Sequence, residues 1–268
     1  MLKRFKNLIK FTEQYPYNTV LGKFLFLDYF LLRLLPKTSF PKMNIIPFVK
    51  KAYKLDSDEE FRIRYYLSKI GAEELWNSRP RNDQVSLEHF YQEHDMDIWR
   101  QAQFSKYDYD CKKKILRTVH VLESLVKKND PILDFGCGSG ALFHYLNERG
   151  FVSIDAADIP SQALNFISRW MPQLVHRIIN LGTEQLPNNQ YAAIVAVDCL
   201  EHTMEPLKIT QNLLESLRPG GIFIVKFPRE SDFSWTHIKR AQEQRDTTFE
   251  FIKKSCETIV PEFVYRKI

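Results

Sequence analysis

Three glycines, Gly136, Gly138 and Gly140, lie within five consecutive residues, although the whole chain has only nine. They follow the short apolar run 131–135 and precede an amphipathic segment, which predicts a turn between a strand and a helix. Glycine lets such a turn bend sharply and lets a ligand lie against bare backbone, where a Cβ atom would interfere. The pattern predicts a ligand site, and the alternative is that the glycines serve only the geometry of the turn.

A carboxylate, Asp158, ends the next predicted strand, 24 residues after Asp134. At the carboxyl edge of a neighbouring strand, such a side chain can accept hydrogen bonds from both hydroxyls of a ribose. The glycine turn and Asp158 together predict that the ligand is a nucleoside. The alternative for Asp158 is a helix N-cap, since Pro160-Ser161 opens the next predicted helix.

The spacing of the glycines is G-x-G-x-G. A nicotinamide-binding domain typically has G-x-G-x-x-G, in which the third glycine allows close packing of the helix that binds the pyrophosphate. The sequence therefore disfavours a nicotinamide oxidoreductase and favours a ligand that crosses the turn without a phosphate.

Three side chains with acid, base or ligand chemistry follow the apolar run 191–197: Asp198, Glu201 and His202. On a helix their spacing would direct them to one side. His202 has the intrinsic pKa best suited to a general base. We predict catalytic roles for His202 and Glu201, with a purely structural role as the alternative.

These residues require a scaffold of alternating strands and helices. Apolar runs predict strands at 131–135, 151–157, 175–180, 191–197 and 222–227, and amphipathic segments predict helices at 141–149, 161–171 and 206–217. Strands that are apolar on both faces and separated by helices indicate a parallel sheet covered on both sides. The predicted fold is α/β, a doubly wound, mostly parallel sheet over residues 106–268, with a mainly helical N-terminal extension over residues 1–105.

Positive charge gathers at the start of the chain. Residues 1–54 carry eleven lysines and arginines against Glu13 and Asp28, whereas the whole chain has a net charge of +5. A basic segment interleaved with apolar side chains is typical of contact with a membrane surface or with nucleic acid. The alternative is an amphipathic helical layer with solvated lysines.

The composition excludes several classes of protein. Hydrophobic residues make up 44% of the 268 residues, which excludes disorder throughout. The four cysteines are far apart and form no C-x-x-C pair, which argues against a zinc ribbon or a disulfide framework. The longest apolar stretch is interrupted by Asp28 and Arg33 and is too short to span a membrane. We expect an unprocessed cytoplasmic protein.

Four segments resemble motifs of the class I S-adenosylmethionine-dependent methyltransferases, in the order and spacing of that family. They are Ile132-Leu133-Asp134-Phe135-Gly136-Cys137-Gly138-Ser139-Gly140, Asp158-Ile159-Pro160-Ser161-Gln162-Ala163-Leu164, Asp198-Cys199-Leu200-Glu201-His202 and Leu217-Arg218-Pro219-Gly220-Gly221. The resemblance covers about residues 110–268 and leaves the first 105 or so uncovered. It implies S-adenosylmethionine as the cofactor and a Rossmann-like fold.

The resemblance also implies roles for individual residues. Asp134 would help to hold the methionine amino group, commonly through water, and Asp158 would bind the ribose hydroxyls. The backbone of the glycine turn would lie under the cofactor, and the segment after the third strand would recognise the adenine. The cofactor-binding residues expected from it are Asp134, Gly136, Cys137, Gly138, Asp158, Ile159, Thr183 and Asp198.

Two departures from the family pattern affect these expectations. Gly182 stands where the family often has an aspartate for the adenine amino group, so adenine recognition would fall to Thr183. After the helix near 249–256 the chain has room for one more strand, 259–266, where the family closes with an antiparallel pair. The sheet is therefore expected to be one strand short.

The implied function is methyl transfer from S-adenosylmethionine to a small-molecule acceptor, lipid-linked or phenolic, under a cover formed by the N-terminal region. The alternatives are a non-catalytic partner subunit that binds the cofactor and a methyltransferase acting on nucleic acid. The sequence D-x-x-E-H is also similar to the E-x-x-E-H set that binds a divalent ion in some O-methyltransferases, with His237 as a further ligand. We predict no bound metal.

Overall fold

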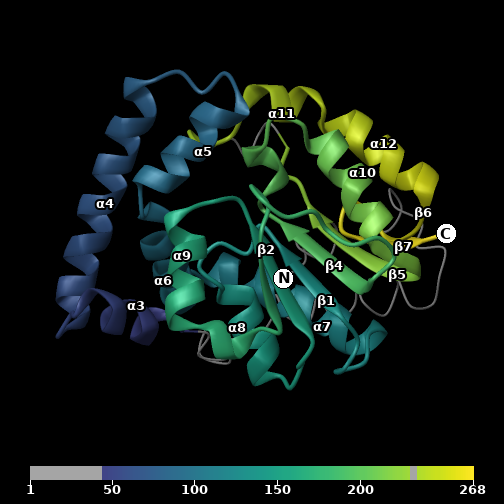
Figure 1. Ribbon diagram of the computed structural model, residues 1–268, viewed down its shortest axis with the longest axis horizontal. Coiled ribbons are helices and arrows are strands. Elements are labelled where there is room, and N and C mark those ends of the chain that lie inside the picture. Colours follow the sequence, from purple (N-terminus) through teal and green to yellow (C-terminus); the bar gives the residue numbers. More distant parts are fainter. Residues whose placement is uncertain (1–43, 230–233) are drawn as a thin grey trace, which may run out of the picture.

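A seven-stranded sheet with the order β3-β2-β1-β4-β5-β7-β6 forms the centre of the molecule. The computed structural model describes residues 44–229 and 234–268 (Figure 1). Strands β1 to β5 are parallel, and β7 pairs antiparallel with both β5 and β6. The strands are β1 (Ile132–Phe135), β2 (Ile154–Asp158), β3 (Arg177–Asn180), β4 (Tyr191–Val197), β5 (Leu217–Lys226), β6 (Cys256–Val260) and β7 (Val264–Lys267).

Helices cover both faces of this sheet. One hydrophobic core joins one face to α7 (Tyr109–Leu125), α8 (Ala141–Glu148) and α9 (Gln162–Trp170). A second core joins the other face to α10 (Pro206–Ser216), α11 (Lys239–Glu243) and α12 (Arg245–Ser255). Alternate residues of a strand face opposite cores, as Ile132 and Leu133 do in β1. The predicted doubly wound α/β fold is confirmed.

The antiparallel end of the sheet corrects one expectation. The sequence predicted a single final strand over 259–266, but the structure has two, β6 and β7, joined by a tight turn over residues 261–263. Glu262 has a left-handed backbone, with φ of 56°. Because the turn contains no glycine or asparagine, the sequence led to a prediction of one strand where the structure has two short ones. The sheet is complete, and the expectation that it lacks a strand was wrong.

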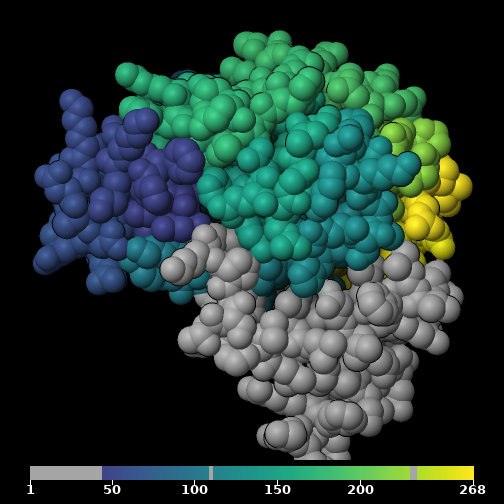
Figure 2. Space-filling model, turned by 90° about the horizontal axis from the view of Figure 1, so that it is seen from below, coloured from purple at the N-terminus to yellow at the C-terminus, as the bar shows by residue number. Residues whose placement is uncertain are grey.

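Helices α3 to α6 precede the sheet and form one end of the molecule (Figures 1 and 2). They are α3 (Ile46–Tyr53), α4 (Asp58–Ser78), α5 (Gln84–Glu93) and α6 (Met96–Tyr107). Helix α6 runs across the predicted domain boundary at residue 105, and Ile98, Trp99 and Ala102 join the core under α7 to α9. The division at residue 105 stays a prediction. Much of the basic segment 1–54 lies outside the described residues.

Short polar side chains fix where several helices begin. Ser57 accepts a hydrogen bond from the Glu60 amide at the start of α4, and Asp83 and Ser86 form a reciprocal capping box on α5. Among the residues described, no helix combines the length and the apolar character needed to cross a bilayer.

Candidate active site

The glycine turn connects β1 to α8 in a conformation that favours glycine. Gly136, Gly138 and Gly140 have φ angles of 68°, 52° and 87°. The amides of Gly136 and Cys137 donate to the Ala157 carbonyl at 2.8 and 3.2 Å, which fixes the turn against β2. A Cβ atom on Gly136 would lie 2.5 Å from Cys199 Cβ, so the turn also packs closely against the loop after β4.

Asp158 holds the glycine turn rather than a helix. Its carboxylate accepts hydrogen bonds from the Gly138 amide at 2.7 Å and from the Ile159 amide at 2.8 Å. Helix α9 is capped by Ser161, whose hydroxyl accepts from the Leu164 amide at 3.0 Å. The alternative of Asp158 as a helix cap was therefore wrong. Each carboxylate oxygen has a second lone pair, so Asp158 can still accept from a ligand.

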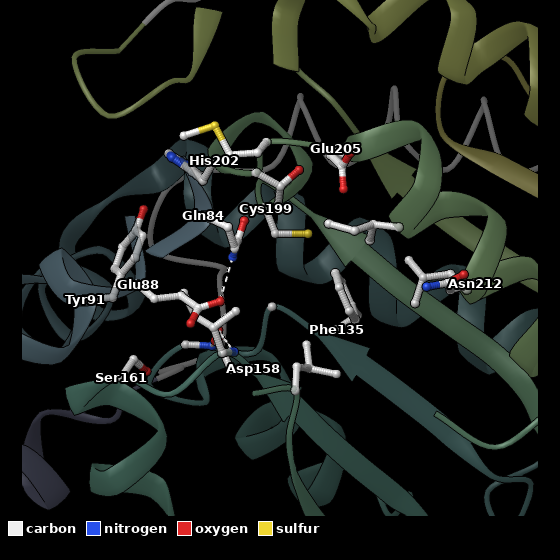
Figure 3. A pocket seen from close by; sticks show the side chains of 18 of the residues that line it. Gln84, Glu88, Tyr91, Phe135, Asp158, Ser161, Cys199, His202, Glu205 and Asn212 are labelled. Atoms are coloured by element: carbon white, nitrogen blue, oxygen red, sulfur yellow. Dashed lines mark hydrogen bonds between the residues drawn. The ribbon is translucent and has the colours of Figure 1, made fainter. Parts of the chain in front are cut away.

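A cavity of about 770 Å³ lies over the carboxyl ends of the central strands. Figure 3 shows Gln84, Glu88 and Tyr91 of α5 on one side of it, with Asp158 below them, Asn212 of α10 on the other side, and Cys199 and Phe135 between. The predicted site residues that line the cavity are Gly136, Gly138, Asp158, Ile159, Asp198 and His202.

The other predicted residues are not among those that line the cavity. Asp134, Cys137 and Glu201 are buried. Thr183 is exposed, with its hydroxyl 3.4 Å from the Asn180 carbonyl, whereas Leu181 of the same segment does line the cavity. A Cβ atom on Gly182 would lie 2.5 Å from Pro160 Cγ, so an aspartate would not fit there without a shift.

Two carboxyl groups beside the glycine turn, the buried Asp134 and the half-buried Asp158, have raised pKa values. Burial, reinforced by the nearby Asp158 charge, raises the pKa of Asp134 to about 7. Burial raises the pKa of Asp158 to about 6, although the hydrogen bonds from Gly138 and Ile159 oppose this. Asp134 Oδ2 has no hydrogen-bond partner. A cationic ligand beside these groups would meet an unused acceptor and favour the charged carboxylates.

Asp198 is held between two lysines. It pairs with Lys114 of α7 and, at 3.3 Å, with Lys226 of β5. Burial alone would raise the pKa of Asp198, but the two ammonium groups outweigh it and hold the pKa below its usual range. Its backbone is left-handed, with φ of 52°, a conformation that costs energy in a residue other than glycine. These contacts fix Asp198 at the cavity wall as a carboxylate.

His202 has a fixed tautomer. It lies in a short 3-10 helix, Leu200–His202, and its Nδ1 atom is 2.9 Å from the Thr236 carbonyl oxygen. A carbonyl oxygen only accepts, so Nδ1 carries the proton and Nε2 keeps a lone pair. Burial, with the Arg100 guanidinium adding to it, lowers the pKa of His202 to about 3. The imidazole is therefore neutral at physiological pH.

Glu201 is buried beside His202. Its side chain is 1% exposed, its Oε2 atom has no hydrogen-bond partner, and its Oε1 atom is 3.9 Å from His202 Nε2. Burial, then the Asp198 charge, raises the pKa of Glu201 to about 8. Ligand atoms of Glu201, His202 and His237 all lie within 4.8 Å of one another, the sole such acidic and imidazole group found in the described part of the chain. Asp198, occupied by its lysines, is not part of this group.

Helices α5 and α6 supply site residues that the sequence did not indicate. Gln101 Oε1 accepts hydrogen bonds from the amide and the hydroxyl of Ser139, at 2.9 and 3.0 Å. Arg100 pairs with Asp97 at 3.1 Å, and both residues line the cavity together with Tyr91. The available signal was that Asp97, Arg100 and Gln101 share one side of α6, away from the side that is buried in the core.

A doubly wound sheet with a glycine turn after β1 and a carboxylate at the end of β2 defines a nucleoside-binding α/β domain. A family model described as "Methyltransferase domain" matches residues 98–256, more than half of the chain. The chain belongs to this family, which confirms the predicted class of S-adenosylmethionine-dependent methyltransferases and the predicted cofactor.

Two curated relatives share part of the chain. It is 30% identical over 103 residues to a tRNA U34 carboxymethyltransferase of Pseudoalteromonas atlantica, covering 37% of this chain and 32% of the relative. It is 30% identical over 110 residues to a ubiquinone biosynthesis O-methyltransferase of Idiomarina loihiensis, covering 39% and 44%. The chain thus spans less than half the length of either relative.

A solved structure covers more of the chain at lower identity. It is a TehB-like SAM-dependent methyltransferase of Corynebacterium glutamicum, 15% identical, which covers 56% of this chain and 86% of its own with a TM-score of 0.43.

We predict that affinity for S-adenosylmethionine rises with pH. Without ligand the pKa values of Asp158 and Asp134 are raised to about 6 and 7. A cationic cofactor favours the carboxylates, so protons leave on binding: affinity is weakened below pH 6, rises through pH 6 to 7 and levels off above. The affinity should rise by up to about tenfold per pH unit for each proton that is released on binding. Calorimetry in two buffers of different ionisation enthalpy counts these protons, and Asp134→Asn should remove the part of the slope near pH 7.

Proposed function

We propose that this protein transfers a methyl group from S-adenosylmethionine to a small-molecule acceptor bound in the same cavity, with His202 as the general base. The observation that supports this most is the continuity of the cavity. About 770 Å³ extends from Gly138 and Asp158 to His202, beneath the side chains of α5 and α6. This volume is within the range of small-molecule sites and suits a nucleoside cofactor with a small partner.

The residues present fit the cofactor. Asp134 Oδ2 lacks a partner, the glycine turn exposes backbone, and Asp158 has spare acceptor capacity. We infer that Asp134, which is buried behind the cavity lining, holds the amino group through a water molecule. Asp158 would hold the ribose, and Ile159 with Leu181 the adenine. When bound, the cofactor supplies an electrophilic methyl group. Alignment of the acceptor with that group then provides much of the rate enhancement.

His202 suits an acceptor whose hydroxyl proton is fairly acidic. Its Nε2 atom has the free lone pair, but burial lowers the pKa of His202 to about 3, which makes the imidazole a weak base. An aliphatic alcohol is a poor match, whereas a phenol, with a pKa of about 10, is a better one. Above about pH 8 the Glu201 carboxylate, 3.9 Å from Nε2, would stabilise the protonated imidazole. A phenolic acceptor is therefore the proposed class.

The charge of the cavity favours a small molecule over nucleic acid. Eight acidic residues line it against three basic ones: Asp83, Glu88, Asp97, Asp158, Glu184, Asp198, Glu205 and Glu215 against Arg100, Lys208 and Arg240. A surface that tracks a phosphate backbone needs the opposite balance. The same acidic surplus attracts a sulfonium cofactor.

The first test is ligand choice. We expect calorimetry to show that the protein binds S-adenosylmethionine and its demethylated product S-adenosylhomocysteine. We expect no binding of NAD, because the turn has the spacing G-x-G-x-G and not the G-x-G-x-x-G that is typical of pyrophosphate binding. Binding of NAD without a response to either sulfur nucleoside would contradict the proposal. Cofactor binding with no turnover on any member of a phenol, alcohol, amine and RNA panel would favour a non-catalytic partner subunit.

The second test concerns His202 as the proposed general base. His202→Asn should lower kcat by roughly 100- to 10,000-fold with the acceptor that gives turnover, while the cofactor Kd stays unchanged. The matched control is His89→Asn, the same substitution on the exposed side of α5. A His202→Asn enzyme with normal kcat would remove His202 from the reaction and leave it a structural role.

A further inference from the structure

The acceptor that fixes the tautomer of His202 belongs to a turn over residues 234–237, which precedes α11. Thr236 of this turn is 1% exposed, and its carbonyl oxygen is 2.9 Å from His202 Nδ1. The hydrogen bond made by one ring nitrogen decides which nitrogen keeps the proton and which one keeps the lone pair. The position of the Thr236 carbonyl therefore decides whether Nε2 can act as a base.

Backbone hydrogen bonds hold the turn on the side that follows Thr236. The Ile238 amide donates to the Glu201 carbonyl at 2.8 Å, which ties the chain to the residue before His202. The His237 amide donates to the Ser234 carbonyl at 2.9 Å, and the Ser234 amide donates to His237 Nδ1 at 3.2 Å. These last two bonds close the turn on itself, so they do not attach it to another element.

On the side that precedes Thr236, the turn packs on the N-terminal helices through Trp235. Its ring lies edge-to-face with Trp76 of α4, with centroids 5.7 Å apart and planes at 75°. Trp76 also lies edge-to-face with Phe90 of α5, with centroids 5.0 Å apart and planes at 88°. This arrangement is preferred because the positive edge of one ring meets the negative face of the other. Trp235 therefore joins the turn to α4 and α5.

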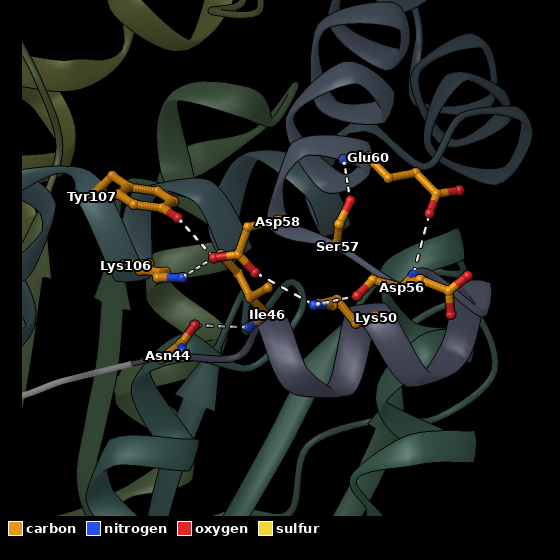
Figure 4. Close-up of polar contacts among 9 residues, drawn as sticks. All are labelled: Asn44, Ile46, Lys50, Asp56, Ser57, Asp58, Glu60, Lys106 and Tyr107. Carbon is orange, nitrogen blue, oxygen red and sulfur yellow. Dashed lines mark hydrogen bonds and ion pairs between the residues drawn. The ribbon is translucent and has the colours of Figure 1, made fainter.

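Helix α4 gives Trp76 a fixed position. At the N-terminal end of the helix, the Asp58 carboxylate accepts from Lys106 at 2.5 Å and from Tyr107 at 3.3 Å. Lys50 donates to the same carboxylate at 3.4 Å (Figure 4). These contacts fix α4 against α3 and α6, and Trp76 lies in the last turn of the same helix.

We propose that Trp235 is a positioning residue for methyl transfer, because its contact with Trp76 holds the Thr236 carbonyl where it accepts from His202 Nδ1. The catalytic part of this proposal rests on the proposed function of His202 as the base, whereas the control of its tautomer does not. Helix α4 thus serves the reaction, although the cavity-lining residues of the described segments include none from it. The alternative is that the bond from Ile238 to Glu201 holds the turn without Trp235.

The test compares Trp235→Ala with Trp235→Phe, which keeps a ring for Trp76. Trp235→Ala should lower kcat by about 10- to 100-fold with KM and the cofactor Kd little changed, because a displaced base affects the chemical step. Trp235→Phe should recover most of that loss. Trp76→Ala should lower kcat to a similar extent and the double alanine variant little further, since both substitutions remove the same contact. The matched control is Trp170→Ala, which removes a half-buried tryptophan of α9 that is not among the cavity-lining residues.

A second measurement does not depend on activity. In protein that carries isotopically labelled histidine, nitrogen NMR shows which ring nitrogen is protonated, and the His202 signals are those missing from His202→Asn. We expect a proton on Nδ1 alone in the unmodified chain and in Trp170→Ala. In Trp235→Ala and Trp76→Ala we expect a mixture of the two tautomers.

A single, unchanged His202 tautomer in Trp235→Ala would overturn the proposal, whatever happens to kcat. If the tautomer changes while kcat stays normal, His202 is not the base. The proposed function then fails, and the control of the His202 tautomer by Trp235 stands. Circular dichroism checks the fold of each variant, and Trp235→Leu, which keeps apolar bulk without a ring, replaces the alanine variant if that one does not fold.

Discussion

Gly138→Val should lower affinity for S-adenosylmethionine by at least about 1,000-fold while the domain stays folded. Gly138 lines the cavity with φ of 52°, and a Cβ atom there would lie 2.0 Å from Gln101 Nε2. Valine would therefore strain the turn and push Gln101 into the space that the ligand needs. Calorimetry gives the Kd and circular dichroism checks the fold.

Gly150→Val is the matched control for backbone strain. Gly150 has φ of 85°, and no atom lies within 4 Å of a Cβ atom built on it. It should therefore show the loss of stability that backbone strain alone causes, with normal affinity. Retained binding in Gly138→Val would mean that the turn serves only the geometry of the chain.

Asp158→Ala should weaken the cofactor by about 2 to 4 kcal/mol, roughly 30- to 1,000-fold, because two ribose hydroxyls lose a charged acceptor. It should also lower stability by about 1 to 3 kcal/mol, since the Gly138 amide, 2.7 Å from the carboxylate, loses its partner. Denaturation and calorimetry on the same variant measure both effects.

Two further variants separate these effects. Asp158→Asn keeps an oxygen for the Gly138 amide, so it should recover much of the stability and little of the affinity. Ser57→Ala removes a true helix cap, 3.0 Å from the Glu60 amide and away from the cavity, and should cost about 1 kcal/mol of stability with the Kd unchanged. Normal affinity in Asp158→Ala would mean that the ribose is held elsewhere.

The strands could be predicted from the sequence because a buried parallel strand is a continuous apolar run, as Tyr191–Val197 is in both sequence and structure. The glycine turn could be predicted because its positive φ angles select a residue type. The turn between β6 and β7 could not, since Glu262 adopts φ of 56° through tertiary contacts. Its side chain pairs with Arg229 and Arg245, and its amide donates to the Tyr265 hydroxyl.

Only those site residues that belong to a local sequence motif could be predicted. Asp158 ends β2 and His202 follows β4, both at the positions expected from the sequence. The contact of Asp198 with Lys114 joins residues 84 positions apart, and no spacing rule relates them. Gln101 belongs to a helix with no motif, and its role arises only because α6 packs beside the turn.

The place of β7 in the sheet has a consequence for biosynthesis. β7 follows every other described strand in the sequence, yet it lies between β5 and β6. A nascent chain can pair β1 to β5 as they emerge, but β6 has no neighbour in the sheet until residues 264–267 have been made. Until then the edge of β5 is an unpaired template for other strands. During co-translational folding, the edge of β5 should therefore stay unpaired until β7 is made, and a chaperone that binds exposed strands would protect it in that interval.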